Sequence, residues 1–393
     1  MNNIADIVIG TIRAQVCGQP YTIEGDLSEE TLKEVFRIAK VQDMSHLVAG
    51  ELLSQGKVTI QAYKDLFKRS QIMAVYRYER INHELTETCR VLEEAGIPYM
   101  PLKGSVIRQY YPEPWMRTSS DIDILVPKEN VDAAADLLVS TLKYENRGID
   151  EHDVQMFAPN GVHLELHFDT IEDYQLKKAN GVLKNLWNED AFCVKGHHYA
   201  MSNELFYFYH IAHMAKHFKY GGCGIRFFLD MWILNHNVKY DRKKKNDLLK
   251  AGDLLDFAKH AERLSEIWFG KASHTEVTQR MEEYILNGGI YGSLENRVVV
   301  KSVRTGGWFR SVLPWIFRPF EELKLQYPIL EKHKWLYPFC QVYRWFYLLF
   351  TKGIFRAKRV LNDGVKAYKE NGENVDQMMK DLNLGIQNTQ YDE

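Results

Sequence analysis

The most constraining feature of this sequence is a change of pattern at Gly96. Over residues 27–96, apolar positions recur at helical spacing. Beyond Gly96, short β-branched segments alternate with helical ones, in the chain order IPYMPLKG, SVIRQYYP, DIDILV, ENVDAAADLLVSTLKY, DVQMFA and VHLELHF. Residues 159–161, Pro-Asn-Gly, separate the last two segments and are typical of a hairpin turn. We therefore expect residues 97–168 to form a β-α-β-α-β-β unit, the core of an α/β or α+β fold.

Helical sequence flanks this unit on both sides, and the chain is long enough for more than one core. Its 393 residues exceed what a single hydrophobic core usually supports. We expect four regions, which are an N-terminal helical region (1–96), a β-rich core (97–170), a further helical region (171–295) and an aromatic, basic helical region with a polar tail (296–393).

Composition excludes several classes of protein. Apolar residues make up 45% of the chain and charged residues 26%, which is typical of globular proteins and not of disordered, collagen-like or disulfide-stapled chains. A formal net charge of −2 argues against a general binder of polyanions. The five cysteines lie far apart and lack CxxC spacing, which favours a reducing compartment over a disulfide framework or a zinc ribbon.

Targeting signals and membrane spans are not expected. The first residues contain neither a basic stretch nor an apolar stretch long enough for a secretory signal. The most apolar run, residues 335–350, is shorter than the roughly 20 residues of a membrane-spanning helix and contains proline, glutamine and arginine. We therefore expect a cytoplasmic protein without stable membrane insertion, while a segment that lies on a membrane surface remains an alternative.

Three features of the β-rich region indicate a functional site. Asp121 and Asp123 stand at i and i+2 of an expected strand, so their carboxylates project from one face and repel each other unless a cation lies between them. Hard carboxylate oxygens favour Mg²⁺ or Mn²⁺. Glu165 lies among alternating apolar residues, on a strand face from which it can meet the Asp pair across the sheet. Gly104 and Ser105, at a strand-to-helix junction, can offer free backbone N–H groups to phosphate.

Each feature alone has an ordinary explanation, such as a solvated strand end or a turn, but their joint order favours a site. The segments LKGS, DIDILV and LELHF resemble the signature of the nucleotidyltransferase superfamily that includes DNA polymerase β. The longer string PLKGSVIRQYYPEPWMRTSSDIDILV resembles more narrowly a bacterial family of uncharacterised nucleotidyltransferases. Two departures from the superfamily pattern fit the narrower family: Lys103 stands in place of an apolar residue, and fifteen residues separate Ser105 from Asp121.

The resemblance implies an α+β fold, with a small mixed nucleotidyltransferase-type sheet embedded in helical regions. It implies that Asp121 and Asp123 bridge two divalent ions, Mg²⁺ or Mn²⁺, and that Glu165 completes the site of the ion that activates the acceptor. Gly104 and Ser105 would hold the β- and γ-phosphates. The implied reaction moves a nucleoside monophosphate from an NTP, ATP by default, to an acceptor hydroxyl and releases pyrophosphate.

The same resemblance leaves two questions open. The acceptor could be a small molecule, a protein or an RNA end, because no residue identifies it. A catalytically inactive protein of the same fold, with a binding or scaffold role, is the alternative to an enzyme.

Two cations and two histidines are further candidates near this site. Lys103 and Arg117 could pair with the triphosphate or be ordinary surface cations, and the bidentate grip of a guanidinium favours Arg117. His163 and His167 share the strand face of Glu165, and this H-x-E-x-H pattern could bind zinc. Beside the Asp pair, we interpret both histidines as hydrogen-bonding neighbours of a magnesium site and as candidates for contact with the acceptor.

A histidine stripe lies further along the chain. His210, His213 and His217 fall on one face of an expected helix, where a structural role is the simpler interpretation. Only the resemblance makes His213 and His217 candidates for the acceptor side of the site. Arg226 and Asp230, at i and i+4, predict an ion pair within the next helix.

The segment 301–360 is unusually aromatic and basic. It contains fifteen aromatic residues, and its twelve Lys/Arg against three Asp/Glu give a net charge of +9, while four prolines divide it into short pieces. The simplest interpretation is a helical subdomain that packs its aromatic residues against the enzyme core. The alternative is contact with an anionic partner, either nucleic acid or a membrane surface. We expect weak, salt-sensitive binding of such a partner at most.

Overall fold

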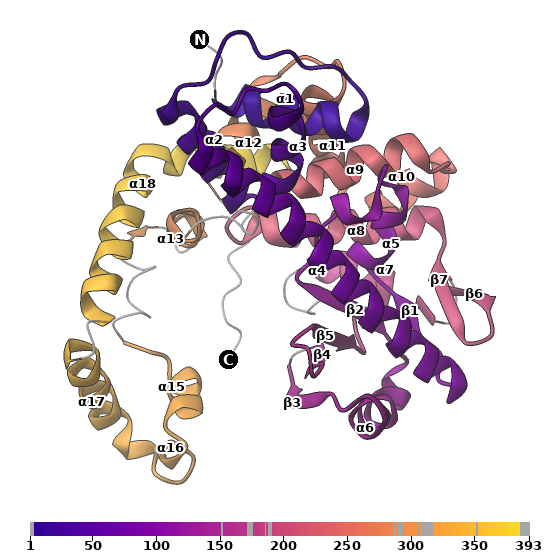
Figure 1. Cartoon of the computed structure of the whole chain (residues 1–393). Helices are drawn as coiled ribbons and strands as arrows, with labels where there is room; N and C mark the ends of the chain where they lie inside the picture. The colour runs from indigo at the N-terminus through magenta and orange to yellow at the C-terminus, as the bar shows by residue number, and fades with distance from the viewer. Residues whose placement is uncertain are drawn as a thin grey trace. The chain divides into compact units, whose positions relative to one another are not determined.

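The computed structural model describes residues 4–150, 152–170, 176–184, 186–187, 191–286, 288, 294–304, 307–308, 317–350 and 353–385. The chain forms two compact units, labelled along the chain in Figure 1. The first unit comprises residues 1–216 and 224–278, and the second comprises residues 217–223 and 279–393. The division of the sequence into four regions stays a prediction.

The first unit begins with helices that pack through their apolar stripes. They are α1 (Ile4–Cys17), α2 (Glu29–Val41), α3 (Ser45–Ser54) and α4 (Gln61–Glu94). Ser28 caps α2, because its hydroxyl oxygen accepts the Thr31 N–H at 3.2 Å. Gly96 follows α4 with a φ of 70°, a backbone conformation that favours glycine after a helix. The helical pattern predicted for residues 27–96 is confirmed.

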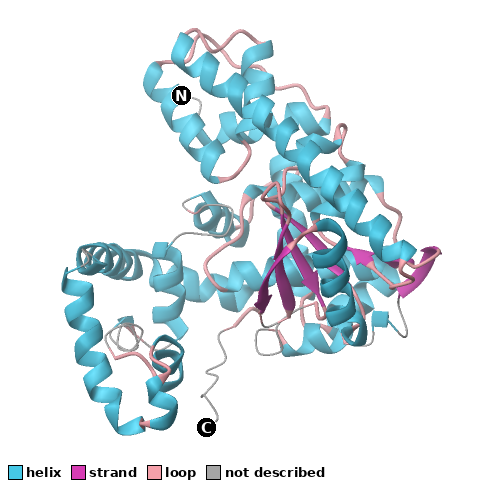
Figure 2. Cartoon of the chain, turned by 60° about the horizontal axis from the view of Figure 1, so that its bottom comes forward, coloured by secondary structure: helices cyan, strands magenta, loops and turns pink. Residues whose placement is uncertain are grey.

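A mixed five-stranded sheet follows α4, in the spatial order β1-β2-β5-β4-β3. Its strands are β1 (Met100–Pro101), β2 (Asp121–Leu125), β3 (Glu145–Ile149), β4 (Asp153–Phe157) and β5 (His163–His167). Strands β2 and β5 pair in parallel, whereas the other neighbours pair antiparallel. Figure 2 shows these strands in magenta among the cyan helices. The sheet and its helices confirm the expected α+β class.

Short helical segments connect the strands. Between β1 and β2 these are α5 (Gly104–Ile107) and the 3₁₀ turns η1 (Arg108–Tyr110) and η2 (Pro114–Met116). Between β2 and β3 they are η3 (Lys128–Asn130) and α6 (Val131–Leu142). Apolar residues of α4 and α6 share one buried cluster with alternate residues of β2, β4 and β5, including Ile122, Met156 and Leu164. One face of the sheet is therefore the core, and side chains at the intervening positions project from the other face.

The structure contains two strand pairings that the sequence analysis did not predict. Strand β3 adds an edge to the sheet, although its sequence ENRGI has no apolar alternation and each of its residues is exposed. Residues 191–201 form the hairpin of β6 (Ala191–Lys195) and β7 (His198–Met201). The expectation that residues 171–295 are helical is wrong at this hairpin. Its turn contains Gly196 with a φ of 59°, a turn signal that the interpretation passed over.

Helices complete the first unit. They are α7 (Lys177–Leu183), α8 (Asn203–Lys219), α9 (Ile225–Asn237), α10 (Arg242–Ala251) and α11 (Leu255–Phe269). Helix α9 is buried along most of its length, and Phe228 of α9 packs edge-on against Trp268 of α11 with ring centroids 4.9 Å apart. The aromatic residues of this region therefore form a second apolar layer in the unit.

The described part of the second unit is helical. Its helices are α12 (Glu276–Leu286), α13 (Leu294–Arg304), α15 (Phe320–Gln326), α16 (Ile329–Lys332), the 3₁₀ turn η5 (Lys334–Leu336), α17 (Tyr337–Phe350) and α18 (Gly353–Asp381). Pro319 and Pro328 stand immediately before α15 and α16, and Pro338 is the second residue of α17. Proline is tolerated at helix starts because the first N–H groups have no partner within the helix. The prediction that prolines divide this segment is confirmed at these three positions, whereas Pro314 lies outside the described residues.

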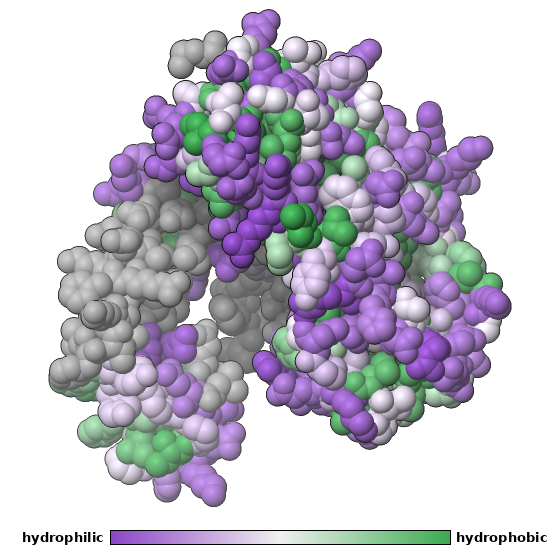
Figure 3. All heavy atoms as spheres, viewed as in Figure 1, coloured by the Kyte–Doolittle hydropathy of each residue, from purple (hydrophilic) through white to green (hydrophobic). Residues whose placement is uncertain are grey.

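Helix α17 and the 3₁₀ turn η5 before it expose aromatic residues that we expected to be packed. Trp335, Phe339 and Tyr343 are 68%, 64% and 62% exposed, and Phe346 and Tyr347 are also exposed. These positions follow helical spacing, so they form one outward stripe. In Figure 3, apolar (green) side chains gather at the end of the second unit around α16. These side chains therefore do not pack within the described part of the second unit, and their packing against the enzyme core stays a prediction.

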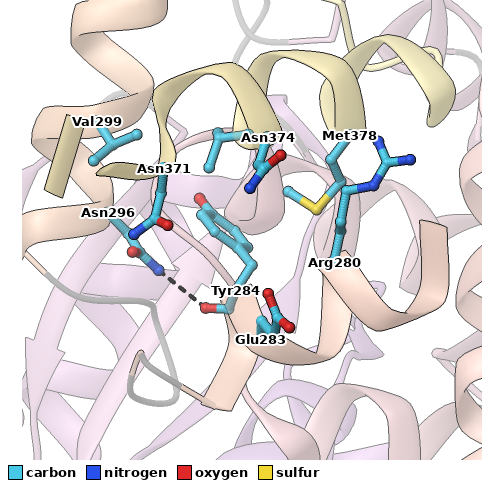
Figure 4. Close-up of a pocket in the computed structure, with 9 residues that line it drawn as sticks. Arg280, Glu283, Tyr284, Asn296, Val299, Asn371, Asn374 and Met378 are labelled. Carbon is cyan, nitrogen blue, oxygen red and sulfur yellow. Dashed lines mark hydrogen bonds between the residues drawn. The ribbon is translucent and has the colours of Figure 1, made fainter. Parts of the chain in front are cut away.

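A small cavity lies between α12, α13 and α18, and Figure 4 shows its lining. Asn296 Nδ2 donates to the Tyr284 carbonyl at 3.0 Å on one side, and Arg280 pairs with Asp381 at 3.1 Å near the other. Its volume of about 70 Å³ has room for a few water molecules and is too small for a nucleotide. None of the described helices in either unit combines the length and the apolar content that crossing a bilayer requires.

Candidate functional site

The candidate site lies on the face of the sheet opposite the apolar core. The parallel register sets Asp121 beside His163 and Asp123 beside Glu165. Since Ile122 lies in the core cluster, its neighbours Asp121 and Asp123 project from the other face. The structure therefore places Glu165 across the sheet from the Asp pair, as the sequence predicted.

Lys103 lies among these carboxylates. Its ammonium Nζ donates to Asp123 Oδ1 at 2.6 Å and lies 3.8 Å from Glu165 Oε2. Burial lowers the pKa of Lys103, but Asp123, Tyr209 and Glu165 outweigh burial and hold it well above its ordinary value. Lys103, one of the two cations considered for the triphosphate, therefore pairs with the carboxylates in this structure.

The backbone of Lys103 is also unusual. Its φ of 46° and ψ of −122° lie in a region that residues with a side chain rarely adopt, at a cost of about 1–3 kcal/mol. The strained residue joins β1 to α5, directly before Gly104. Such strain persists only where surrounding contacts fix the conformation, and the pairing of Lys103 with Asp123 is one such contact.

His167 links two of the carboxylates. Its ring Nε2 lies 2.9 Å from Asp123 Oδ1 and 3.4 Å from Glu165 Oε2, and its side chain is 1% exposed. Burial and Lys103 lower the pKa of His167, but Asp123 and Glu165 outweigh them and raise it above its ordinary value. His163 hydrogen-bonds Gln155 and stacks on Phe157 at a centroid distance of 4.6 Å.

The two aspartates have different electrostatic environments. Burial, followed by the neighbouring charge of Asp123, raises the pKa of Asp121. Burial opposes ionisation of Asp123 as well, but Lys103 and His167 outweigh it and hold the pKa of Asp123 well below its usual range. Burial raises the pKa of Glu165, but the hydrogen bond with His167 and the charge of Lys103 outweigh burial and lower it. Asp123 and Glu165 are therefore ionised at neutral pH, and Asp121 is the easiest of the three to protonate.

Two overlapping groups on this face could hold a metal ion. Asp121, His163 and Glu165 form one, and Asp123, Glu165 and His167 form the other; within each group the possible ligand atoms lie within 4.8 Å of one another. Glu165 belongs to both groups. The geometry therefore places His163 and His167 among the possible ligands, in addition to the three carboxylates.

The turn at Gly104 and Ser105 differs from the expected cradle of free N–H groups. The Ser105 N–H donates to the Leu102 carbonyl at 3.1 Å, and the Val106 N–H donates to the Lys103 carbonyl at 3.1 Å. Gly104 is buried, and a Cβ added there would lie 3.1 Å from Nη1 of Arg117. Glycine at position 104 therefore makes room for Arg117. That Gly104 and Ser105 bind phosphate stays a prediction.

Arg117 forms a buried ion pair with Asp230. Its Nε donates to Asp230 Oδ1 at 2.8 Å and its Nη2 to Asp230 Oδ2 at 2.8 Å, with Arg117 7% exposed and Asp230 fully buried. Tyr111 donates its hydroxyl to the same carboxylate at 2.7 Å. Arg226 instead binds Asp43 and the Thr118 carbonyl. The predicted Arg226–Asp230 ion pair within α9 is therefore wrong, because long-range partners take both residues.

His210 and His213 of α8 have the contacts of packed side chains. His210 Nε2 lies 3.1 Å from the Phe227 carbonyl, and burial lowers the pKa of His210. His213 packs between Tyr209 and Phe227, with centroid distances of 6.4 Å and 5.6 Å. The His217 carbonyl accepts the N–H groups of Tyr220 and Gly222. An acceptor-side role for His213 and His217 stays a prediction.

Sequence analysis missed two residues next to the site. His152 lies beside His167, with ring centroids 5.2 Å apart, and belongs to a third possible ligand group with Asp153 and His167. The signal was the string EHD, whose last residue begins the expected strand DVQMFA. Tyr209 of α8 acts on the charge of Lys103, and no local pattern in the sequence could have revealed that approach.

A mixed sheet with paired aspartates on one strand and a third carboxylate on the neighbouring parallel strand defines a nucleotidyltransferase-type core. The family model described as uncharacterised nucleotidyltransferase matches residues 28–270. This match covers more than half of the chain, and the protein belongs to this family. It extends from α2 to α11 and therefore includes helices on both sides of the sheet. Neither a curated protein nor a solved structure matches the chain.

Proposed function

We propose that this protein is a metal-dependent nucleotidyltransferase that moves a nucleoside monophosphate from an NTP to an acceptor hydroxyl and releases pyrophosphate. The observation that supports it best is the β2–β5 register, which sets Asp123 beside Glu165 on the open face of the sheet. Membership of the nucleotidyltransferase family supports the reaction class. ATP is the default donor only because it is abundant, and the acceptor is a small molecule, a protein or an RNA end.

The residues on this face suit a divalent cation. Asp121, Asp123 and Glu165 would hold Mg²⁺ or Mn²⁺ through carboxylate oxygens. Imidazole nitrogen from His163 or His167 would add a ligand that Mn²⁺ accepts more readily than Mg²⁺ does. When bound, two such ions stabilise the attacking and leaving oxygens of a displacement at phosphorus.

The chain's own residues prepare the site for this chemistry. Asp123 and Glu165 are ionised at neutral pH, so they can take up a cation without first losing a proton. In the absence of a metal, the Lys103 ammonium neutralises them, with its Nζ 2.6 Å from Asp123 Oδ1 and 3.8 Å from Glu165 Oε2. A cation that takes over these carboxylates would release the Lys103 ammonium for the triphosphate, where positive charge offsets the charge of the reacting phosphates.

Pyrophosphate release tests the proposal. Purified protein is assayed with each of the four NTPs, with Mg²⁺ or Mn²⁺, and with a cell lysate as the source of acceptor. Asp123→Asn keeps the shape of the side chain and should abolish release, while Asp136→Asn on the exposed face of α6 should leave it unchanged. Activity that survives in Asp123→Asn would contradict the assignment. Label from the NTP then identifies the acceptor as protein, RNA or small molecule.

One observation favours the alternative of an inactive binding protein. Lys103 neutralises Asp123 and Glu165 without a metal, as a lysine could do permanently in a protein that had lost catalysis. Calorimetry distinguishes the two functions. An enzyme binds NTP more tightly when Mg²⁺ is present, whereas a permanent Lys103 pair leaves NTP binding independent of Mg²⁺.

A further inference from the structure

A second cavity of the first unit lies outside the candidate site. It opens between α2, α3 and the first half of α4, and Thr118 of the loop before β2 also lines it. Its volume is about 480 Å³, within the range of pockets that hold small organic ligands. The carboxylates of β2 and β5 do not line it. The cavity is therefore a separate place at which this chain could bind a ligand.

Positive charge dominates the lining of this cavity. Lys40, Arg69 and Arg77 contribute three cations, and Asp43 contributes the only carboxylate among the residues that line it. Among the described residues, no carboxylate lies within ion-pair distance of Lys40 or Arg69. A cavity with surplus cations favours an anionic ligand, because such a ligand supplies the missing countercharge.

The carboxylate in the lining is already neutralised. Arg77 Nη1 lies 3.2 Å from Asp43 Oδ1, Arg226 Nη1 lies 3.3 Å from Asp43 Oδ2, and the Thr118 hydroxyl donates to Asp43 at 2.8 Å. Burial raises the pKa of Asp43, but Arg226 and Arg77 outweigh burial and lower it. Asp43 therefore fixes Arg77 in place and leaves the cations of Lys40 and Arg69 unbalanced.

The start of α3 adds to the positive potential. Ser45 and His46 line the cavity, and α3 begins at Ser45 without a side-chain cap. The N-terminus of a helix carries partial positive charge and backbone N–H groups that suit phosphate. Burial lowers the pKa of His46, so the ring does not supply another cation. The start of α3 therefore adds to the preference for an anionic ligand that the charges of Lys40 and Arg69 already indicate.

The walls of the cavity are apolar and partly exposed. Phe36, Leu66 and Met73 line it, and Leu66 and Met73 are 42% and 44% exposed. Exposed apolar side chains beside unbalanced cations fit a ligand that has both an organic body and an anionic group. Inorganic phosphate alone would leave these apolar surfaces in water.

We propose that this cavity binds the phosphate group of a small organic phosphate, with Lys40 and Arg69 as the phosphate-binding residues. The organic body of the ligand lies against Phe36, Leu66 and Met73. Thr118 is three residues before Asp121, so binding is next to the loop that leads into the candidate site. This inference does not depend on the proposed function, because it requires neither a metal nor catalysis.

Calorimetry with phenyl phosphate tests the inference on the full chain in buffer with EDTA, which keeps divalent metal out of the carboxylate site. We expect phenyl phosphate to bind more tightly than inorganic phosphate, and phenol not to bind. Arg69→Gln and Lys40→Gln should each weaken phenyl phosphate at least tenfold. Arg37→Gln, on α2 and paired with Glu34, and Lys68→Gln, beside Arg69 on α4, serve as matched controls with wild-type affinity.

Several results would overturn the inference. Equal affinity of Arg69→Gln and Arg37→Gln for phenyl phosphate would show that the cavity cations do not bind phosphate. Phenol bound as tightly as phenyl phosphate would show an apolar pocket without anion recognition. Because Lys40 and Arg69 are exposed, their variants should fold, and circular dichroism checks this. Asp123→Asn should retain phenyl phosphate binding, which separates this inference from the proposed function.

Discussion

Replacing Lys103 by methionine should strengthen metal binding while it weakens activity. Methionine keeps the length of the side chain and removes the ammonium that donates to Asp123 at 2.6 Å and lies 3.8 Å from Glu165. Under the proposed function, a divalent cation would have to displace this ammonium from the carboxylates of the wild type. In the variant, the carboxylates have no such competitor, but the cation proposed for the triphosphate is missing as well.

The contacts set the size of the effect. Lys103 is 21% exposed and Asp123 6% exposed at the side chain, so solvent screens the pair only in part. A hydrogen bond between charged groups of this kind contributes about 1.5–3 kcal/mol, which corresponds to roughly a 10- to 150-fold change in an equilibrium constant. We expect Mn²⁺ affinity to rise by about this factor in Lys103→Met, and pyrophosphate release to fall.

Electron paramagnetic resonance of free Mn²⁺ measures the affinity directly. Lys178→Met is the matched control, because Lys178 pairs with Asp253 at a similar distance of 2.7 Å but both side chains are well exposed. This control should bind Mn²⁺ like the wild type. The variant Lys103→Met should also gain more thermal stability from Mn²⁺ than the wild type does, because the metal replaces a lost countercharge. Unchanged or weaker Mn²⁺ binding in Lys103→Met would refute the idea that Lys103 competes with the metal.

Three more predictions follow from other contacts. The pKa of His167 is raised, so its imidazolium is present at low pH and is lost as pH rises through that pKa. Mn²⁺ affinity should therefore increase with pH through and above about 6.5, the ordinary pKa of histidine. The variant His167→Gln should flatten this pH dependence. Asp230→Asn should lower the free energy of unfolding by about 3–5 kcal/mol, because it leaves the buried Arg117 without its carboxylate; urea unfolding measures this, and unchanged Mn²⁺ affinity would show a structural role. Liposome flotation should show at most weak, salt-sensitive binding through residues 301–360, and tight binding at physiological salt that deletion of this segment abolishes would make it a docking module.

The sequence allowed much of the candidate site to be predicted, because its signals are local. The strands β2, β4 and β5 contain apolar residues at alternate positions, and this period of two indicates which residues face away from the core. The same alternation places Asp121, Asp123 and Glu165 on one face. The parallel pairing of β2 with β5 was not readable from local pattern, because pairing depends on the whole topology.

Long-range partners could not be predicted. Arg117 lies 113 residues from Asp230, and local spacing offered Asp230 only the neighbour Arg226 on its own helix. Strand β3 was not predicted, because its sequence ENRGI contains a single apolar residue and its pairing with β4 rests on backbone hydrogen bonds. The cavity between α2, α3 and α4 brings together residues that no single helix pattern associates.

The charges of the candidate site suggest why it contains both a lysine and a buried histidine. Three carboxylates on one face would repel one another strongly if each were ionised without countercharge. Lys103 and the His167 ring offset this repulsion, which allows the buried Asp123 and the half-buried Glu165 to remain ionised. Under the proposed function, Asp121, Asp123 and Glu165 would hold a divalent cation that supplies this countercharge, and the Lys103 ammonium would then be free to pair with the triphosphate. Lys103 directly precedes Gly104, so an ammonium released from the carboxylates would be close to the turn where the triphosphate is expected.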